Sequence, residues 1–243
     1  MKPSNEIAKI VAWLHDYVDQ AGANGYVVGL SGGIDSACTA VLCQRAAGDA
    51  VLGVLMPCHS VSDDVEMARL VTDTFGLRTV TVDLATTYDA LLLAIPSAVP
   101  SMASANLKPR LRMATLYTLA QTHGYLVAGT GNKSELAVGY FTKYGDGGVD
   151  VEPLGDLYKW QVCRLAGELG IPQSIIDRPP SAGLWAGQTD EGEMGISYDE
   201  LDSVLTAIET GQTGIVDPAL LVKVQRMIGA SAHKRTPPPI CRL

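Results

Sequence analysis

Four short apolar runs alternate with helical patterns over the first 140 residues, and this alternation restricts the fold more than any other feature. The runs cover residues 26–30, 51–56, 79–83 and 125–128, and each has the length of a buried strand. Apolar residues at helical spacing mark 5–21, 35–47, 62–75 and 109–123. Strands separated by such helices predict an α/β fold, with a doubly wound parallel sheet and helices on both faces.

The rest of the chain is predicted to be mostly helical. Residues 156–169, 197–209 and 217–228 have amphipathic helical patterns, whereas the Asp177-Arg178-Pro179-Pro180 stretch cannot lie inside a helix. No repeat and no low-complexity linker divides the sequence. We therefore expect a single domain over 1–243, with a core of about 22–180 and a helical C-terminal part of about 181–243 packed on the sheet.

Composition excludes several classes of protein. Apolar residues make up 47% of the 243 residues, enough for a large core, and the net charge of −8 opposes binding to nucleic acid or an acidic membrane. No apolar run approaches the length of a membrane span. The five cysteines form no C-x-x-C pair, which argues against disulfides and structural zinc. A soluble cytoplasmic protein is the expectation.

The first glycine loop, Leu30-Ser31-Gly32-Gly33-Ile34-Asp35-Ser36, lies between a predicted strand and a predicted helix. Its glycines expose backbone amides, and the helix N-terminus adds the positive end of a dipole, so a phosphate fits there. A carboxylate in an anion-binding loop favours a bridging cation, and Asp35 is predicted to hold Mg²⁺. The alternative is an ordinary Gly-Gly turn, with Ser31 as N-cap and Asp35 in the first helical turn.

A second glycine turn, Gly129-Thr130-Gly131-Asn132-Lys133-Ser134-Glu135, follows the fourth predicted strand. Carboxyl ends of parallel strands meet at one edge of the sheet, so Glu135 is placed to share one Mg²⁺ with Asp35. The alternative is a helix capped by Asn132, with Glu135 completing a capping box. Both interpretations can hold at once.

Two polar segments are further candidates for binding. The stretch Phe141-Thr142-Lys143-Tyr144-Gly145-Asp146-Gly147-Gly148-Val149-Asp150 is a loop rich in functional residue types, although a solvated turn explains it equally. Ala232-His233-Lys234-Arg235 is a cationic cluster in an acidic chain, and a charged helix C-terminus is its alternative explanation.

The first glycine loop resembles the pyrophosphate loop of the N-type ATP pyrophosphatases. Together with the second turn, the Phe141–Asp150 loop and His233-Lys234-Arg235, it resembles the ammonia-dependent NAD synthetase family. The segments 108–113, 187–191 and 195–200 fit the same family and follow its order. The resemblance implies an adenine nucleotide alpha hydrolase-like fold and the ATP-dependent amidation of deamido-NAD by ammonia. The reaction would pass through an acyl-adenylate and yield NAD⁺, AMP and pyrophosphate.

The resemblance also implies roles for individual residues. Asp35, Glu135 and Lys159 would be catalytic, and Asp35 and Glu135 would bind Mg²⁺. ATP would contact Gly29, Leu30, Ser31, Gly32, Gly33, Ile34, Asp35, Ser36, Thr130, Lys159 and Ser181. Deamido-NAD would contact Arg110, Lys143, Asp150, His233 and Lys234, of which the cations suit a polyanionic substrate.

The family is homodimeric with shared sites, and the apolar stretches 91–93 and 116–119 are candidates for an interface. The segment 94–106 contains no aromatic residue for stacking on the substrate's pyridine ring, so Met102 and Tyr17 are the candidates for that contact. Glutamine-using relatives carry an additional nitrilase-type domain, and the early start of the first helix leaves the expectation that free ammonia is the nitrogen donor.

Two other functions remain open at this stage. A tRNA-thiolating relative would use catalytic cysteines such as Cys58 and Cys163, but the negative charge opposes it. A non-enzymatic nucleotide-binding module is the second alternative, and the paired carboxylates Asp35 and Glu135 disfavour it.

Overall fold

The computed structural model describes residues 5–60, 62–185 and 187–242. Its sheet contains β1 (Tyr26–Gly29), β2 (Val51–Leu55), β3 (Thr79–Thr81) and β4 (Leu126–Ala128) in the order β3-β2-β1-β4. All the strand pairs are parallel, with Val27 of β1 beside Leu52 of β2 and Val127 of β4. The prediction of a parallel α/β sheet is confirmed.

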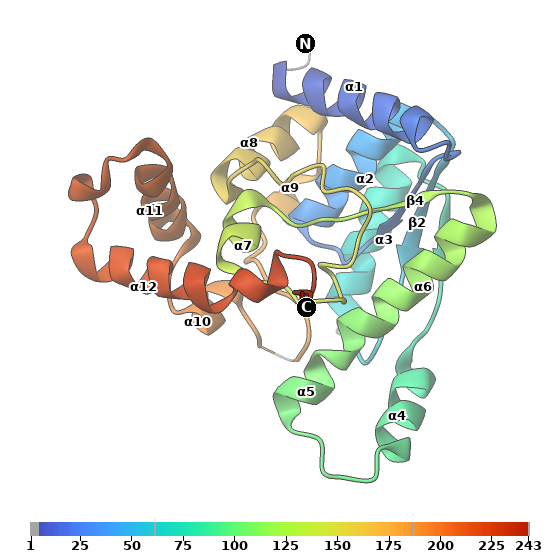
Figure 1. Cartoon of the computed structure of the whole chain (residues 1–243). Helices are drawn as coiled ribbons and strands as arrows, with labels where there is room; N and C mark the ends of the chain where they lie inside the picture. Colours follow the sequence, from blue (N-terminus) through green and yellow to red (C-terminus); the bar gives the residue numbers. More distant parts are fainter. Residues whose placement is uncertain (1–4, 61, 186, 243) are drawn as a thin grey trace.

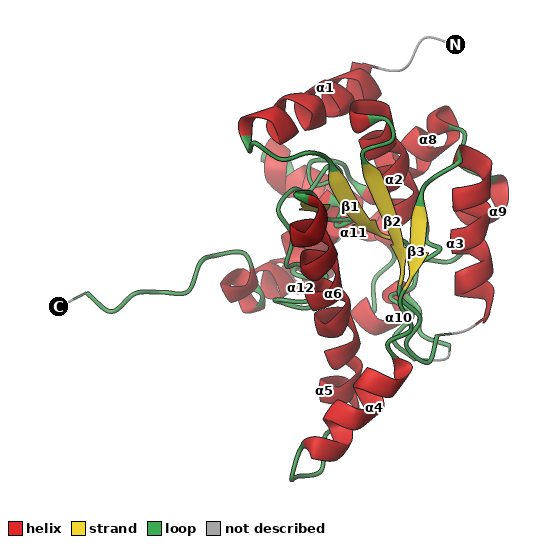
Figure 2. Ribbon diagram, turned by 90° about the vertical axis from the view of Figure 1, so that its right-hand side faces the viewer, coloured by secondary structure: helices red, strands yellow, loops and turns green. Residues whose placement is uncertain are grey.

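Helices cover both faces of this sheet. Tyr26 and Val28 point into a core shared with α1 (Asn5–Gln20), α2 (Ile34–Ala47), α3 (Ser62–Phe75) and α8 (Lys159–Leu169). Val27 points the other way, into a core closed by α6 (Leu107–His123). Successive side chains of a strand face opposite sides, so β1, apolar throughout, is buried from both. Figure 2 shows α6 on one side of the strands and α3 on the other.

A second core holds the C-terminal helices together. It packs α7 (Lys133–Val138), α10 (Asp190–Met194), α11 (Tyr198–Thr210) and α12 (Pro218–Ala230) around the fully buried Leu201 and Val224. Short 3₁₀ turns, η1 (Thr213–Ile215) and η2 (Ala232–Lys234), flank α12. Figure 1 shows α11 and α12 beside the main body, with α7 between them and the sheet.

An arm made of α4 (Ala85–Ala94) and α5 (Ser101–Ala105) projects from the body below the sheet (Figure 1). The sequence patterns did not predict these helices. No residue of α4 is buried although the helix is strongly apolar, and Leu93 is 89% exposed. The short helix α9 (Gln173–Ile176) completes the set of described helices.

Helix α8 begins later than predicted. The pattern indicated a helix from residue 156, but residues 154–157 form a turn in which the Leu157 amide donates to the Leu154 carbonyl at 2.9 Å. Lys159 is therefore the first residue of α8. The strand β3 is also shorter than predicted, as it has a partner on one side only. Helix α6 includes Pro109 because a proline within the first turn loses no helical hydrogen bond.

Candidate active site

A cavity of about 800 Å³ opens at the carboxyl ends of β1, β2 and β4. Four parts of the chain line it: the first glycine loop, the second glycine turn, residues 139–149, and the segment from Arg178 to Asp190 as far as it is described. Ligands bind at this edge in doubly wound sheets, because loops of different strands converge there. The predicted location is confirmed.

The first glycine loop is shaped by a close contact with α3. Gly32 has a φ of +85°, and a Cβ at this position would lie 2.3 Å from the Asp64 carbonyl oxygen. The Ser31 hydroxyl donates to the Ser36 hydroxyl at 3.1 Å, which in turn donates to the Gly33 carbonyl at 2.9 Å. Helix α2 begins directly after the loop, with Gly33 as N-cap and no capping side chain. Ser31 is thus not the N-cap that the alternative interpretation required.

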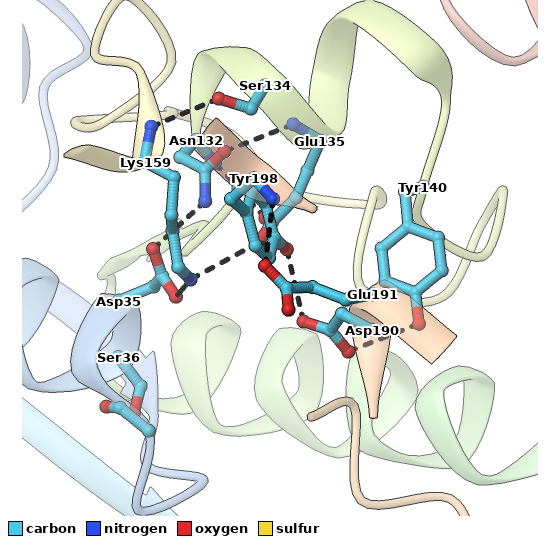
Figure 3. A network of polar contacts seen from close by, with 12 residues as sticks. Asp35, Ser36, Asn132, Ser134, Glu135, Tyr140, Lys159, Asp190, Glu191 and Tyr198 are labelled. Atoms are coloured by element: carbon cyan, nitrogen blue, oxygen red, sulfur yellow. Dashed lines mark hydrogen bonds and ion pairs between the residues drawn. The ribbon is translucent and has the colours of Figure 1, made fainter. Parts of the chain in front are cut away.

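The structure brings Asp35, Glu135 and Lys159 together. The Lys159 Nζ lies 2.6 Å from Asp35 Oδ2 and 3.6 Å from Glu135 Oε1. Figure 3 shows the lysine side chain ending between the two carboxylates. The three residues come from the first turns of α2, α7 and α8, so three helix N-termini converge on one buried point.

Asn132 links the two carboxylates. Its Nδ2 donates to Asp35 Oδ1 at 3.1 Å, and its Oδ1 accepts from the Glu135 amide at 3.0 Å. The Glu135 carboxylate in turn accepts from the Asn132 amide at 3.3 Å, which completes the capping box of α7. The predicted capping box is confirmed, and it positions Glu135 within the cavity.

Burial strongly affects the charges of this group. Burial, followed by the nearby charge of Asp35, raises the pKa of the Glu135 carboxyl, although Lys159 opposes the shift. Burial lowers the pKa of Lys159, but Asp35 and Glu135 outweigh it and raise that pKa above its ordinary value. Lys159 is therefore a permanent cation, and one cation faces two carboxylates. An additional positive charge would relieve the remaining imbalance.

A chain of polar contacts surrounds this centre, and sequence reasoning assigned no role to its members. Tyr198 donates to Glu135 at 3.0 Å and contacts Asp190 at 3.1 Å. Tyr140 contacts Asp190 at 3.1 Å and Glu193 at 2.8 Å (Figure 3). Only the resemblance of segments 187–191 and 195–200 signalled these residues, because tyrosines in amphipathic helices are usually core residues.

The predicted ATP contacts lie together. The cavity is lined by Gly29, Leu30, Ser31, Gly33, Ile34, Asp35, Ser36, Thr130, Lys159 and Ser181. Gly32 does not line it and instead packs against α3.

The predicted substrate residues are more dispersed. Lys234 lines the cavity and donates to the Gly139 and Phe141 carbonyls at 2.7 Å each. Arg110 donates to the Lys143 carbonyl at 3.4 Å, and Lys143 donates to the His233 carbonyl. Arg110, Lys143 and His233 thus form a basic strip beside the cavity, and none of them lines it in the single chain.

Two predicted contacts lie elsewhere in the single chain. Both Asp150 oxygens are engaged, one by the Tyr117 hydroxyl at 3.0 Å and the other by the Val127 amide at 2.8 Å, and Asp150 does not line the cavity. Tyr17 lies on α1, where its ring contacts Trp13 at 5.6 Å, so the prediction that it stacks in this cavity is wrong for the single chain. Met102 does line the cavity, together with the unpredicted aromatic residues Phe141 and Trp185.

The donor set suits Mg²⁺. No group of three or more His, Cys, Asp or Glu side chains arranged for a metal occurs in the described ranges. Asp35 and Glu135 provide two carboxylates beside a phosphate-binding loop, and Mg²⁺ is typically held by one or two carboxylates together with substrate phosphates and water. The residues therefore fit the ion in the presence of a nucleotide.

The fold and its glycine loops define an α/β protein that binds a nucleotide at the carboxyl edge of a parallel sheet. Residues 6–238 match the family model described as NAD synthase. The NH₃-dependent NAD⁺ synthetase of Carboxydothermus hydrogenoformans is 47% identical over 236 residues, which are 96% of this chain and 95% of that protein. The chain belongs to the NAD synthase family.

Solved structures agree with this assignment. The NMN synthetase from Francisella tularensis has a TM-score of 0.92 and 35% identity, with both chains fully covered. The NH₃-dependent NAD synthetase from Campylobacter jejuni has a TM-score of 0.86 and 30% identity, again with full coverage of both. Among the described residues, no helix is long and apolar enough to cross a bilayer.

Proposed function

We propose that this chain couples ATP cleavage to the amidation of deamido-NAD by ammonia and yields NAD⁺, AMP and pyrophosphate, the last step of NAD biosynthesis. Membership of the NAD synthase family makes it a ligase that forms a carbon–nitrogen bond. The observation that carries the detailed proposal is the convergence of Asp35, Glu135 and Lys159 beside the first glycine loop.

The first step is adenylation of the substrate carboxylate. The carboxylate oxygen attacks the α-phosphorus of ATP, and the bond from that phosphorus to the departing pyrophosphate breaks. The first glycine loop and the α2 N-terminus hold the phosphates, while Lys159 places a permanent cation where the negative charge of the leaving group grows. Thr130 and Ser181 lie in the same cavity to orient the nucleotide.

The second step forms the amide. Ammonia attacks the carbonyl carbon of the acyl-adenylate, AMP leaves, and the nitrogen releases a proton. Little acid–base chemistry is required of the side chains, so orientation and electrostatics supply most of the catalysis. Only the free base of ammonia is nucleophilic, so the rate at subsaturating ammonium is expected to rise with pH above neutrality.

Mg²⁺ would be held by Asp35 and Glu135 together with the phosphates of ATP. When bound, it supplies positive charge that neutralises the developing pyrophosphate. The unbalanced carboxylates and the raised pKa of Glu135 support this part of the proposal.

A homodimer would complete the dinucleotide site. The basic strip of Arg110, Lys143 and His233 lies outside the single-chain cavity, and the apolar arm of α4 and α5 projects nearby without a covering partner. Met102 belongs to this arm and also lines the cavity, so a second copy packed on the arm would lie beside bound substrate. In the strip, Lys143 and Arg110 would bind the substrate pyrophosphate.

The cysteine-based alternative has no support in the geometry. Burial raises the thiol pKa of both Cys58 and Cys163, which is the opposite of what a catalytic thiolate requires. Every cysteine of the described chain is free, as is usual in a reducing compartment, and this supports a cytoplasmic location.

An assay with purified protein tests the proposal. Protein, ATP, Mg²⁺ and ammonium are incubated with deamido-NAD or with nicotinate mononucleotide, and NAD⁺, NMN, AMP and pyrophosphate are quantified. We expect NAD⁺, AMP and pyrophosphate in equal amounts. The structural neighbour described as an NMN synthetase gives the second substrate its place in the assay. Preferential turnover of the mononucleotide, or turnover with glutamine as efficient as with ammonium, would contradict the proposal.

A further inference from the structure

Helix α11 contacts the catalytic group from behind, through two residues one turn apart. Tyr198 and Asp202 are 5% and 3% exposed, and both face the N-termini of α7 and α8. The first-turn position of Tyr198 and the i+4 spacing to Asp202 place both side chains on one face of the helix. Neither residue has a role in the mechanism described above.

Tyr198 fixes the Glu135 carboxylate. Its hydroxyl donates to Glu135 Oε1 at 3.0 Å, on the side away from the Asn132 amide that binds Oε2 (Figure 3). The two contacts leave the carboxylate little rotational freedom. The Tyr198 ring also lies under the Lys159 ammonium, 4.9 Å from Nζ to the ring centroid. The hydroxyl and the ring therefore serve different members of the catalytic group.

Asp202 fixes the start of α8. Its Oδ2 accepts from the Trp160 amide at 3.2 Å, and its Oδ1 accepts from the Ser134 hydroxyl. The Ser134 oxygen in turn accepts from the Lys159 amide at 3.0 Å. The first two amides of α8 are thus satisfied by groups from α7 and α11. A carboxylate at a helix N-terminus is also favoured by the helix dipole.

The consequence for Lys159 follows from its place in the helix. Because it is the first residue of α8, its backbone position is set by these two contacts and not by helical hydrogen bonds to its own amide. The side chain then extends to Asp35 and Glu135. Asp202 therefore acts on Lys159 in the same way that Tyr198 acts on Glu135.

We propose that Tyr198 and Asp202 are positioning residues, through which the C-terminal helical part sets Glu135 and Lys159 for the adenylation step. The proposal rests on the proposed function. It assigns a role to the segment 195–200 of the sequence, and extends it to residue 202. Both residues also belong to or border the second core, so a test must separate positioning from simple packing.

The variants are Tyr198→Phe and Asp202→Asn, with matched controls from the same neighbourhood. Tyr198→Phe keeps the ring under Lys159 and removes only the hydroxyl. Its control is Tyr158→Phe, which removes a tyrosine–carboxylate contact of 2.7 Å to Glu209, also on α11. The control for Asp202→Asn is Glu209→Gln. Each protein is compared in thermal unfolding, in kcat and KM with deamido-NAD and ammonium, and in ATP binding by calorimetry with Mg²⁺ or with EDTA.

We expect kcat to fall by about 10- to 100-fold in both variants, with KM for deamido-NAD changed far less. ATP affinity of Tyr198→Phe should fall in Mg²⁺ and stay unchanged in EDTA, because the hydroxyl acts through Glu135. ATP affinity of Asp202→Asn should fall in both buffers, because Lys159 contacts the nucleotide directly. The controls should behave as the unmodified protein.

Two results would overturn the proposal. One is a kcat loss no greater than in the controls. The other is a joint loss of melting temperature, kcat and affinity in every buffer, which indicates a packing role alone. The calorimetric comparison uses ATP without deamido-NAD, so it remains decisive if the unmodified protein fails to amidate this substrate. That failure would contradict the proposed function and not the positioning.

Discussion

At the scale of single residues, the two carboxylates beside Lys159 carry the heaviest chemical demand. We predict that Asp35→Asn and Glu135→Gln each reduce turnover by at least about 100-fold, since charge stabilisation by a metal is worth several kcal/mol. Each change keeps the size of the side chain and removes a negative charge. Product assays at saturating ATP measure the effect, and circular dichroism checks the fold. Near-normal turnover in either variant would refute the metal-binding role of that residue.

The basic strip should distinguish the two nucleotides. Arg110→Ala and Lys143→Ala are predicted to weaken deamido-NAD binding by about 1.5–3 kcal/mol, the contribution of a hydrogen bond to a charged group. ATP binding should change little, because neither residue lines the cavity. Calorimetric titrations with each ligand make the comparison, with Lys223→Ala on α12 as the control. Equal losses for both ligands would be inconsistent with this assignment.

Residue-level prediction worked where a residue's chemistry has few explanations. Asp35 follows a glycine pair after a strand, and Glu135 follows a second glycine turn, so their convergence could be predicted from the order of strands alone. Tyr198 and Asp202 could not be assigned a role in this way. Their contacts depend on how α11 packs against α7 and α8, which is a tertiary property that helical periodicity does not encode.

At the scale of elements, the first glycine loop depends on one backbone conformation. We predict that Gly32→Ala destabilises the protein by about 1–2 kcal/mol or more, as its φ of +85° disfavours side chains and the new Cβ would meet the Asp64 carbonyl. Gly33→Ala is the control for stability, because its Cβ would approach only the Ser31 hydroxyl, at 3.4 Å. Equal stability of the two variants in urea unfolding would contradict this account of the loop.

The predicted elements were most accurate in the alternating part of the chain. The four strands and the helices α1, α2, α3 and α6 were found within a few residues, because apolar periodicity reflects burial against the sheet. The arm was missed because α4 buries none of its apolar residues, so its pattern has no polar face to mark it as a helix. The start of α8 was misplaced because acceptors from distant residues define it.

At the scale of the whole molecule, the exposed arm leads to a prediction about assembly. We expect a dimer in sedimentation experiments, and we expect Leu93→Asp to shift it toward monomer and lower turnover, because a charge would be buried against the second copy. Ile215→Asp, at an equally apolar residue that is 77% exposed between α11 and α12, is the control. A fully active monomer at nanomolar concentration would rule out the shared site.

The central claim is that the substrate carboxylate attacks the α-phosphorus of ATP within the cavity formed by the first glycine loop, Lys159 and the two carboxylates. Deamido-NAD labelled with ¹⁸O in its carboxylate tests this claim most directly. Attack at the α-phosphorus transfers one labelled oxygen to AMP when ammonia displaces it, and leaves pyrophosphate unlabelled. We predict labelled AMP as detected by mass spectrometry. Label in pyrophosphate or inorganic phosphate, or unlabelled AMP alongside NAD⁺, would contradict the mechanism.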